Sequence, residues 1–306
     1  MSNHTITKPS FSDTEQGILK FGCSGNMFNI SSLNGFFDKS KSMGFDVKYV
    51  SQGCERYSVN NQVYDVSAGS YLLLNGEKDL KVEIESGKNT KGVCITISSE
   101  LIEELISSLV QPGAPQADPD LAAFFYRDHF LENQYQSGFT ALGKKMQEIS
   151  AAVEKNKFYT NDIHEELFFQ LAEHLVHDQV RVFKQLQYIP SVKINTRKDL
   201  FRRVNRGREF IDAFFLTDLP IKEIAREASM SEYHFFRLFK KVFGASPHQY
   251  ILRKRLETGK QLLLVQQPVS SVALDCGFAD IFSFSKAFKK HFGVSPSALL
   301  AQKSRI

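Results

Sequence analysis

One segment of this chain occurs twice near its carboxyl end, and this repeat constrains the fold more than any other feature. Residues 221–228, IKEIAREA, return 48 positions later as VSSVALDC at 269–276. Residues 239–247, FKKVFGASP, return 49 positions later as FKKHFGVSP at 288–296. The second copy therefore has one extra residue in its turn. Two copies of a short helix, a tight turn and a basic helix indicate a tandem helix-turn-helix, a DNA reader with two heads.

Local signals place the turn and the second helix of each copy. Ser229 and Gly277 occupy the turn position, where a positive φ suits glycine better than serine. Ser231 and Asp280 then act as N-caps. The second helix of each copy is expected to bury one apolar face: Phe235, Leu238, Phe239 and Val242 in the first copy, and Phe284, Ala287, Phe288 and His291 in the second.

The opposite face of each second helix is the predicted DNA surface, because polar and aromatic side chains read base edges and lysines bind phosphates. The candidate base-reading residues are Tyr233, Phe236, Arg237, Ile281, Phe282, Ser285 and Lys286. The candidate backbone contacts are Ser231, Lys240, Lys241, Lys289 and Lys290. The helix between the heads is predicted at 247–264, which at about 1.5 Å per residue spans about 27 Å. Successive major-groove openings are about 34 Å apart, so the two heads suit adjacent turns of DNA.

Four ordered stretches of this region resemble the AraC/XylS transcription regulators. They are SxxHFxRLFKKxFGxSP at 231–247, QYIxxxRLE at 249–257, CGFAD at 276–280 and FSxxFKKxFGxSP at 284–296. The resemblance implies an AraC-type DNA-binding domain with two helix-turn-helix motifs. Three places depart from the family pattern: Phe282-Ser283, Gly259 where alanine is usual, and Leu299-Leu300. The first of these bears on the base preference of the second head.

Charge separates the chain into two parts. Residues 193–306 hold 21 Lys and Arg against 10 Asp and Glu, a net charge of +11, whereas residues 1–192 have a net charge of −7. An excess of basic residues that follows the repeat is expected of a part that meets phosphate. We therefore predict a sensor or dimerisation domain at 1–187, a linker at 188–198 and the DNA-binding domain at 199–306. The first helix of the latter is expected at 200–215, with Val204, Phe210, Ile211 and Phe214 inward.

Short β-like runs separated by turn residues fill the region before residue 98. The predicted strands are 45–50, 55–59, 62–66, 70–74, 80–84 and 92–97, with a hairpin turn at Asn60-Asn61. Such a pattern favours a barrel or sandwich, and the order of its Gly, Tyr and Val residues is similar to the cupin-like sensor domain of AraC-type regulators. The predicted class is α+β multidomain: a cupin-like β-barrel or sandwich with trailing helices, followed by an all-α tandem helix-turn-helix domain.

The predicted β domain lacks the residues of a metal enzyme. It has no histidine between His4 and His129, so catalytic cupin chemistry is not expected. The four cysteines are scattered without a CxxC pair, which signals neither zinc nor disulfides. His174 and His177 fit a polar helix face better than a metal site. We predict no cofactor; the domain binds a small organic effector or serves only in dimerisation.

Helical periodicity follows from Ser99 onward. Helices are predicted at 99–109, 139–155 and 161–185, with a loop at 112–119. An apolar stripe marks the last helix: Ile163, Leu167, Phe168, Leu171 and Leu175. We predict that this stripe forms a homodimer; the alternative is that it packs within its own domain.

The leading functional prediction is a sequence-specific transcription regulator. An enzyme-linked regulator would need a nucleophile with a base or a metal cluster, and a nonspecific architectural binder would need contacts dominated by lysine. Neither pattern is present, although the sequence leaves activation and repression equally open. Residues 1–11 lack the apolar core of a signal peptide, and no apolar run reaches the roughly 18 residues of a membrane span. A cytoplasmic, non-membrane protein is therefore expected.

Overall fold

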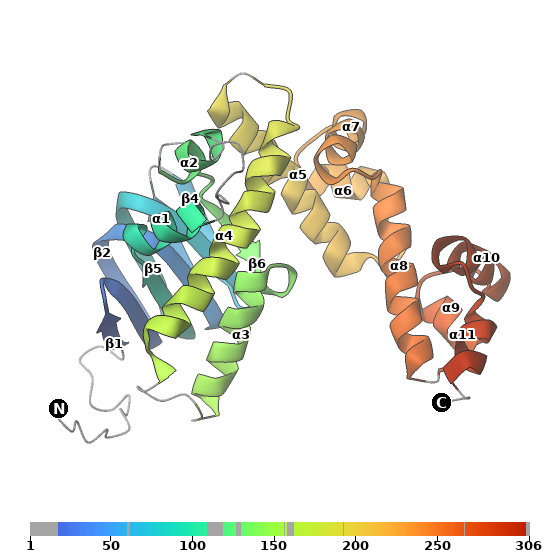
Figure 1. Ribbon diagram of the computed structural model, residues 1–306, viewed down its shortest axis with the longest axis horizontal. Coiled ribbons are helices and arrows are strands. Elements are labelled where there is room, and N and C mark those ends of the chain that lie inside the picture. Colours follow the sequence, from blue (N-terminus) through green and yellow to red (C-terminus); the bar gives the residue numbers. More distant parts are fainter. Residues whose placement is uncertain are drawn as a thin grey trace. The chain divides into compact units, whose positions relative to one another are not determined.

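The structure is a computed structural model that describes residues 18–59, 62–108, 119–126, 130–155, 157, 162–191, 193–265 and 267–303. The chain divides into two units, Met1–Lys184 and Gln185–Ile306 (Figure 1). The predicted turn at Asn60-Asn61 and the predicted loop residues 112–118 lie outside the described residues.

The described strands of the amino-terminal unit form one antiparallel sheet. The strands are β1 Ile18–Cys23, β2 Asn26–Gln52, β3 Cys54–Val59, β4 Gln62–Ser67, β5 Ser70–Ile97 and β6 Asn133–Gln136. Their order is β1-β2-β5-β3-β4, and β6 pairs with β5. The predicted α+β class, with a β domain in the amino-terminal part, is confirmed.

The long strand β5 corrects the prediction of three separate strands at 70–74, 80–84 and 92–97. Gly76 and Gly87 lie inside it with φ of +77° and +83°. They bend the strand, but its ladder with β2 continues on both sides of each. The sequence prediction also missed β1 and the first part of β2, because residues 26–44 are rich in Ser, Asn, Gly and Lys instead of alternating apolar residues.

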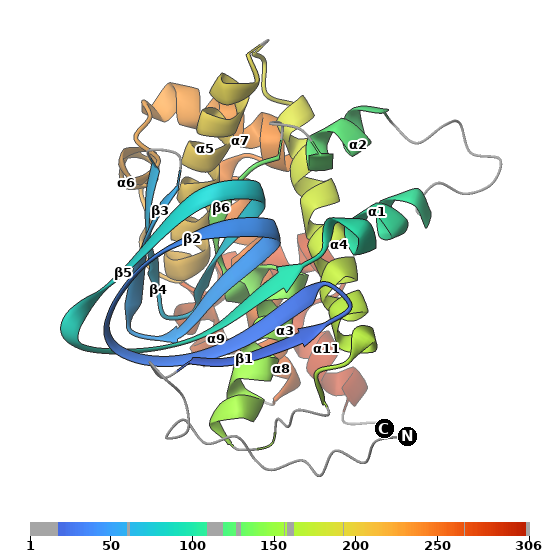
Figure 2. The ribbon, with the colours of Figure 1, turned by 90° about the vertical axis from the view of Figure 1, so that its left-hand side faces the viewer.

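The length of β2 and β5 makes the sheet curl back on itself (Figure 2). Val47 of β2 pairs with Leu73 and also with Ile95, so the end of β2 lies between two segments of β5. A buried apolar cluster lies within the curl: Val50, Tyr57, Val59, Val66, Leu72, Leu74 and Leu80.

Helices pack against the sheet in the same unit. They are α1 Ser99–Ser108, α2 Pro119–Tyr126, α3 Ala141–Glu154 and α4 Glu165–Gln187. α1, α3 and α4 confirm the predicted helices, whereas α2 was not predicted. The ring of Phe124 in α2 lies 5.5 Å from that of Phe183 in α4, and the Phe45 ring of β2 lies 5.4 Å from the Phe130 ring. The Phe125 ring of α2 also lies 6.2 Å from the Phe45 ring, so aromatic packing joins α2 to both α4 and the sheet.

The apolar stripe of α4 is covered within the amino-terminal unit. Leu167, Phe168, Leu171 and Leu175 are buried in the single chain, and Ile163 is half-buried. On the same helix, Gln179 donates to the Tyr135 hydroxyl over 3.3 Å. The stripe thus stabilises the amino-terminal unit itself, and its use in dimerisation stays a prediction.

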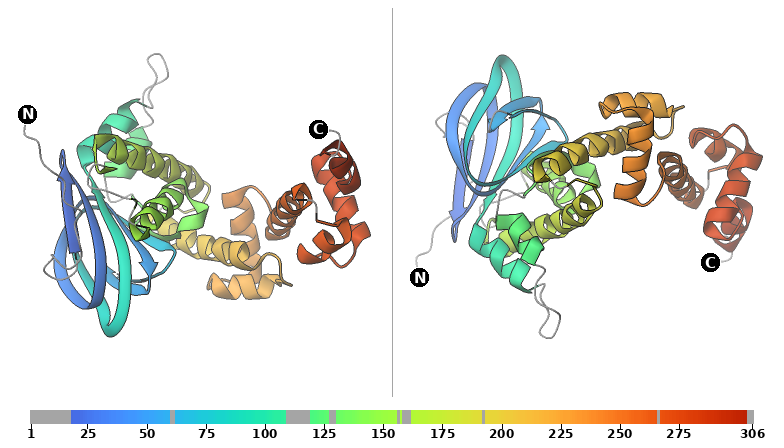
Figure 3. Two further views of the ribbon diagram at one scale, coloured as in Figure 1. Left: turned by 90° about the horizontal axis from the view of Figure 1, so that it is seen from below. Right: turned by 90° about the horizontal axis from the view of Figure 1, so that it is seen from above.

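The carboxy-terminal unit is helical, as predicted. Its helices are α5 Ile194–Phe214, α6 Ile221–Glu227, α7 Glu232–Phe243, α8 Pro247–Leu264, α9 Val269–Asp275, α10 Ile281–Phe292 and α11 Pro296–Lys303. α6–α7 and α9–α10 are the two copies of the repeat, and α8 runs between them (Figures 1 and 3). The bounds predicted for α8 are confirmed, whereas α5 begins six residues before the predicted Leu200.

The structural repeat extends to the helix that precedes each copy. Gly207 of α5 faces the ring of Phe235. A Cβ at position 207 would lie only 2.4 Å from that ring. Gly259 of α8 faces Phe284 in the same way, at 2.9 Å. Each repeat is therefore a three-helix unit, and the glycine that departs from the family pattern at 259 makes room for an aromatic ring.

The prediction is wrong for two side chains that were expected to point inward. Phe214 is 46% exposed and lies against Phe210, with ring centroids 4.8 Å apart. His291 is exposed beside Phe292, at 4.6 Å between ring centroids. Phe292 packs against the core cluster of the second copy. The polar imidazole of His291 stays in contact with water, because its burial would cost free energy.

Candidate nucleic-acid interface

The turn of each copy has the geometry predicted for it. Ser229 and Gly277 have φ of +52° and +73°. After the turn, the Met230 amide donates to the Ala225 carbonyl over 2.9 Å, and the Phe278 amide donates to the Ala273 carbonyl over 3.0 Å. Both turns close with the same hydrogen bond, and the extra residue of the second copy, Ala279, lies between this closure and the N-cap of α10.

The predicted N-caps start α7 and α10. The Ser231 Oγ accepts from the His234 amide over 3.4 Å, and the Asp280 Oδ1 accepts from the Ser283 amide over 2.7 Å. That amide, aided by the Ser283 hydroxyl, lowers the pKa of Asp280. Left-handed glycines, Gly244 and Gly293, end the two helices.

The exposed face of α7 combines aromatic and basic side chains. Tyr233 is 71% exposed, and Phe236 and Arg237 are exposed beside it. The Arg237 Nη1 donates to the Tyr233 hydroxyl over 2.8 Å, and its guanidinium lies 5.4 Å from the centre of the Tyr233 ring. The ring thus orients a guanidinium that has five donors and can bond bidentately to guanine.

The equivalent face of α10 is more apolar. Phe282, which corresponds to Tyr233, is 82% exposed, and Ile281 is exposed as well. Lys286 takes the place of Arg237 and is exposed, whereas Ser285 is half-buried. This face can contact a thymine methyl but offers one cationic point charge instead of a bidentate fork.

Lysine pairs lie at the carboxyl ends of both helices. Lys240 and Lys241 in α7, and Lys289 and Lys290 in α10, are all exposed. Positive charge at this end also complements the helix dipole. The pairs therefore stabilise the helices and are available to phosphates.

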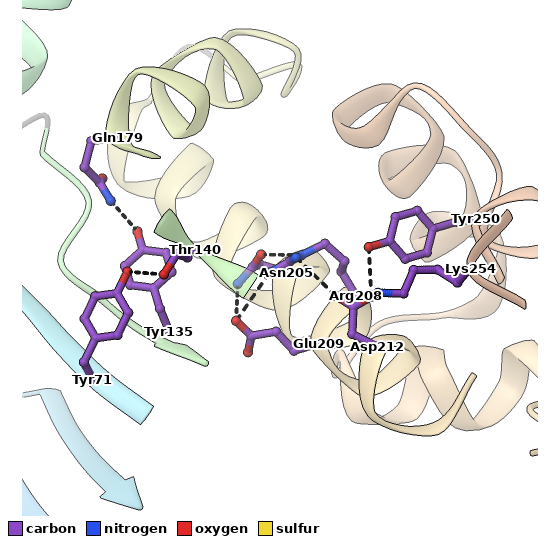
Figure 4. A network of polar contacts seen from close by, with 10 residues as sticks. All are labelled: Tyr71, Tyr135, Thr140, Gln179, Asn205, Arg208, Glu209, Asp212, Tyr250 and Lys254. Atoms are coloured by element: carbon purple, nitrogen blue, oxygen red, sulfur yellow. Dashed lines mark hydrogen bonds and ion pairs between the residues drawn. The ribbon is translucent and has the colours of Figure 1, made fainter. Parts of the chain in front are cut away.

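A buried ion-pair network that sequence reasoning missed holds α5 against α8 (Figure 4). Asp212 of α5 is at its centre. Its carboxylate lies 3.2 Å from Arg208 Nη1 and 2.9 Å from Lys254 Nζ, and it accepts from the Tyr250 hydroxyl over 2.9 Å. Burial, with the nearby Asp212 charge, raises the pKa of Tyr250 to about 12, so this hydroxyl stays a donor at neutral pH. Only Arg208, four residues away, lies within reach of a helical sequence pattern, whereas Tyr250 and Lys254 are 38 and 42 residues away and give no sequence signal.

Metal and membrane signals are both absent from the part of the chain that the structure describes. Its residues include no group of three or more His, Cys, Asp or Glu that could hold a metal ion. Its helices include none that is long and apolar enough to cross a membrane.

Comparison with known proteins identifies the two-headed unit. The sequence profile of a family described as "Helix-turn-helix domain" matches residues 224–302, which span both copies. The carboxy-terminal unit therefore holds an AraC-type helix-turn-helix domain. The chain is 40% identical over 89 residues to the probable transcriptional regulator LumQ of Photobacterium leiognathi, a match that covers 29% of this chain and 36% of LumQ.

Two further matches are less similar in sequence. The lactose operon transcription activator of Staphylococcus xylosus is 23% identical over 81% of this chain and 80% of its own length. A solved AraC-type regulator from Chromobacterium violaceum is 29% identical, with a TM-score of 0.31, and covers 33% of this chain and 90% of that one. The chain spans only about a third of the length of LumQ.

Proposed function

We propose that this protein is a sequence-specific DNA-binding transcription regulator that reads two adjacent major grooves with α7 and α10. The observation that carries the proposal is the pair of exposed faces at equivalent positions of the two copies, in a part of the chain with a net charge of +11. Relatives are named as a probable transcriptional regulator and a transcription activator, which supports a regulatory role. The proposal includes that the protein is not an enzyme and that it acts in the cytoplasm.

The residues of the predicted DNA surface divide into two roles under this proposal. Base edges are read by the faces of α7 and α10: Tyr233, Phe236, Arg237, Ile281, Phe282, Ser285 and Lys286. Phosphates are bound by Ser231, Lys240, Lys241, Lys289 and Lys290. Ser231 already accepts a hydrogen bond as N-cap, but its hydroxyl hydrogen is available to a phosphate oxygen.

The amino-terminal unit has the role of sensing a small effector, dimerising, or both. A buried polar group between β2 and β5 supports the sensing role. Lys48 Nζ lies 3.3 Å from Asp46 Oδ2 and 2.8 Å from Cys94 Sγ. Burial alone would lower the pKa of the Lys48 ammonium, but Cys94 and Asp46 together outweigh burial and raise it. A charged group that is largely withdrawn from water costs free energy even when it is paired, which favours a role in recognition over one in packing.

Selection of bound sequences from random duplex DNA by the full-length protein tests the proposal. The expected result is one motif with two half-elements about one helical turn, ~10 base pairs, apart. Recovery of unrelated sequences with equal affinity would show a nonspecific binder and refute the proposal.

A further inference from the structure

Arg255 touches the backbone of both copies of the repeat. It lies in the middle of α8 and is half-buried. Its Nε donates to the Phe215 carbonyl over 2.6 Å and its Nη2 donates to the Thr217 carbonyl over 2.6 Å. Its Nη1 donates to the Gly277 carbonyl over 2.7 Å. The first two carbonyls follow α5 and precede the first head, whereas the third is in the turn of the second head.

The turn of the second head lies directly on the segment that Arg255 holds. A Cβ at Gly277 would lie 2.6 Å from the Leu216 carbonyl oxygen and 3.0 Å from Arg255 Cζ. The adjacent residue of α8, Lys254, pairs with Asp212 of α5. The Arg255 guanidinium therefore links α8 to two other segments, residues 215–217 and the turn at Gly277.

We propose that Arg255 fixes the separation of α7 and α10 and so determines which spacing of half-sites the protein accepts. This inference rests on the proposed function. One inserted base pair moves a half-site by about 3.4 Å along the duplex and turns it by about 35°. Two heads on a rigid joint meet only one of these arrangements, whereas two loosely joined heads follow the displaced half-site. Lysine cannot replace arginine here, because its single nitrogen does not span three separated carbonyls.

Binding to displaced half-sites tests this positioning role. The probes are the duplex selected by the wild-type protein and the same duplex with one base pair inserted between its half-elements. The wild type should bind the inserted duplex about 100-fold or more weakly, since contacts to several base pairs are lost. Arg255→Lys and Arg255→Gln should bind the original duplex more weakly and lose less than about 10-fold on insertion. Arg253→Ala, which changes an exposed residue of the same helix, is the matched control. It should keep the wild-type ratio of affinities for the original and the inserted duplex.

A distance measurement makes the test independent of DNA binding. Nitroxide labels at Lys240→Cys and Lys289→Cys, in a chain with Cys23 and Cys54 replaced by serine, report the separation of α7 and α10. Double electron–electron resonance should give a narrow distribution with Arg255 and a broad one with either replacement. Circular dichroism melting shows whether each variant is folded, and the glutamine variant substitutes if the lysine variant is not. A distribution or an insertion ratio unchanged by loss of Arg255, or a wild type indifferent to insertion, would overturn the proposal. Failure of the selection itself refutes the proposed function but leaves the distance test decisive for Arg255.

Discussion

Ser229 and Gly277 occupy the same turn position, yet only one of them suits its backbone. Both have left-handed φ, which costs a residue with a Cβ about 1–2 kcal/mol. Ser229→Gly should therefore raise the free energy of unfolding of the carboxy-terminal unit by about 1 kcal/mol. Gly277→Ala should lower it by ~2 kcal/mol or more, because its Cβ would also collide with the Leu216 carbonyl. Urea unfolding followed by circular dichroism measures both, and opposite signs are the expected result. Equal effects would mean that the turns do not differ in strain.

Arg237 is the residue expected to contribute most to sequence preference. Arg237→Ala should cost about 1–3 kcal/mol on the selected site and relax the preference at one base pair. Tyr233→Phe keeps the ring but removes the hydroxyl that accepts from the guanidinium, so a smaller loss is expected. Fluorescence anisotropy with a set of single-base variants measures both. If Arg237→Ala weakens binding equally on every duplex, Arg237 contacts a phosphate and not a base.

Between the two recognition helices, α10 should discriminate less than α7. Its most exposed side chains are Phe282 and Ile281, which offer no bidentate hydrogen bonds. The half-site under α10 should therefore tolerate more substitutions in the selected sequences. A sharp, guanine-rich half-site that is lost in Phe282→Ala would contradict this expectation.

The lysine pairs at the ends of α7 and α10 should act through phosphates. Removing one such contact should reduce the slope of log K against log salt by about one unit. Lys289→Ala and Lys290→Ala, each compared with the wild type over a salt series, measure this. If the slope stays constant while the melting temperature falls, the lysines stabilise the helix end and do not contact phosphates.

How far the sequence predicts each element depends on the range of the signal. The caps at Ser231 and Asp280 and the turns at Ser229 and Gly277 follow from local chemistry, and the structure confirms them. The continuity of β5 could not be predicted, because a glycine that bends a strand and a glycine that ends one look alike in sequence. Apart from Arg208, the partners of Asp212 and Arg255 lie far along the chain, so the roles of these two residues emerge only from the folded unit. Arg255 does occur in the stretch that resembles the family, but the resemblance gave it no role.

In the whole molecule, the covered stripe of α4 bears on assembly. Leu171 and Leu175 are fully buried in the single chain. The double change Leu171→Glu and Leu175→Glu should therefore unfold the amino-terminal unit, at a cost of several kcal/mol, whether or not the protein dimerises. Circular dichroism reports the unfolding, and sedimentation of the wild type at micromolar concentration tests the predicted homodimer. A double variant that stays folded and only dissociates would place the stripe at a subunit interface instead.

Two-headed reading of DNA is the central claim for the whole molecule, and hydroxyl-radical footprinting on the selected duplex tests it most directly. The full-length protein should protect two patches on one face of the duplex, with centres about 10 base pairs apart. Changing Tyr233 and Arg237 to alanine should remove one patch, and changing Phe282 and Lys286 to alanine should weaken the other. A single patch, or a footprint that the changes in α10 leave intact, would contradict the account.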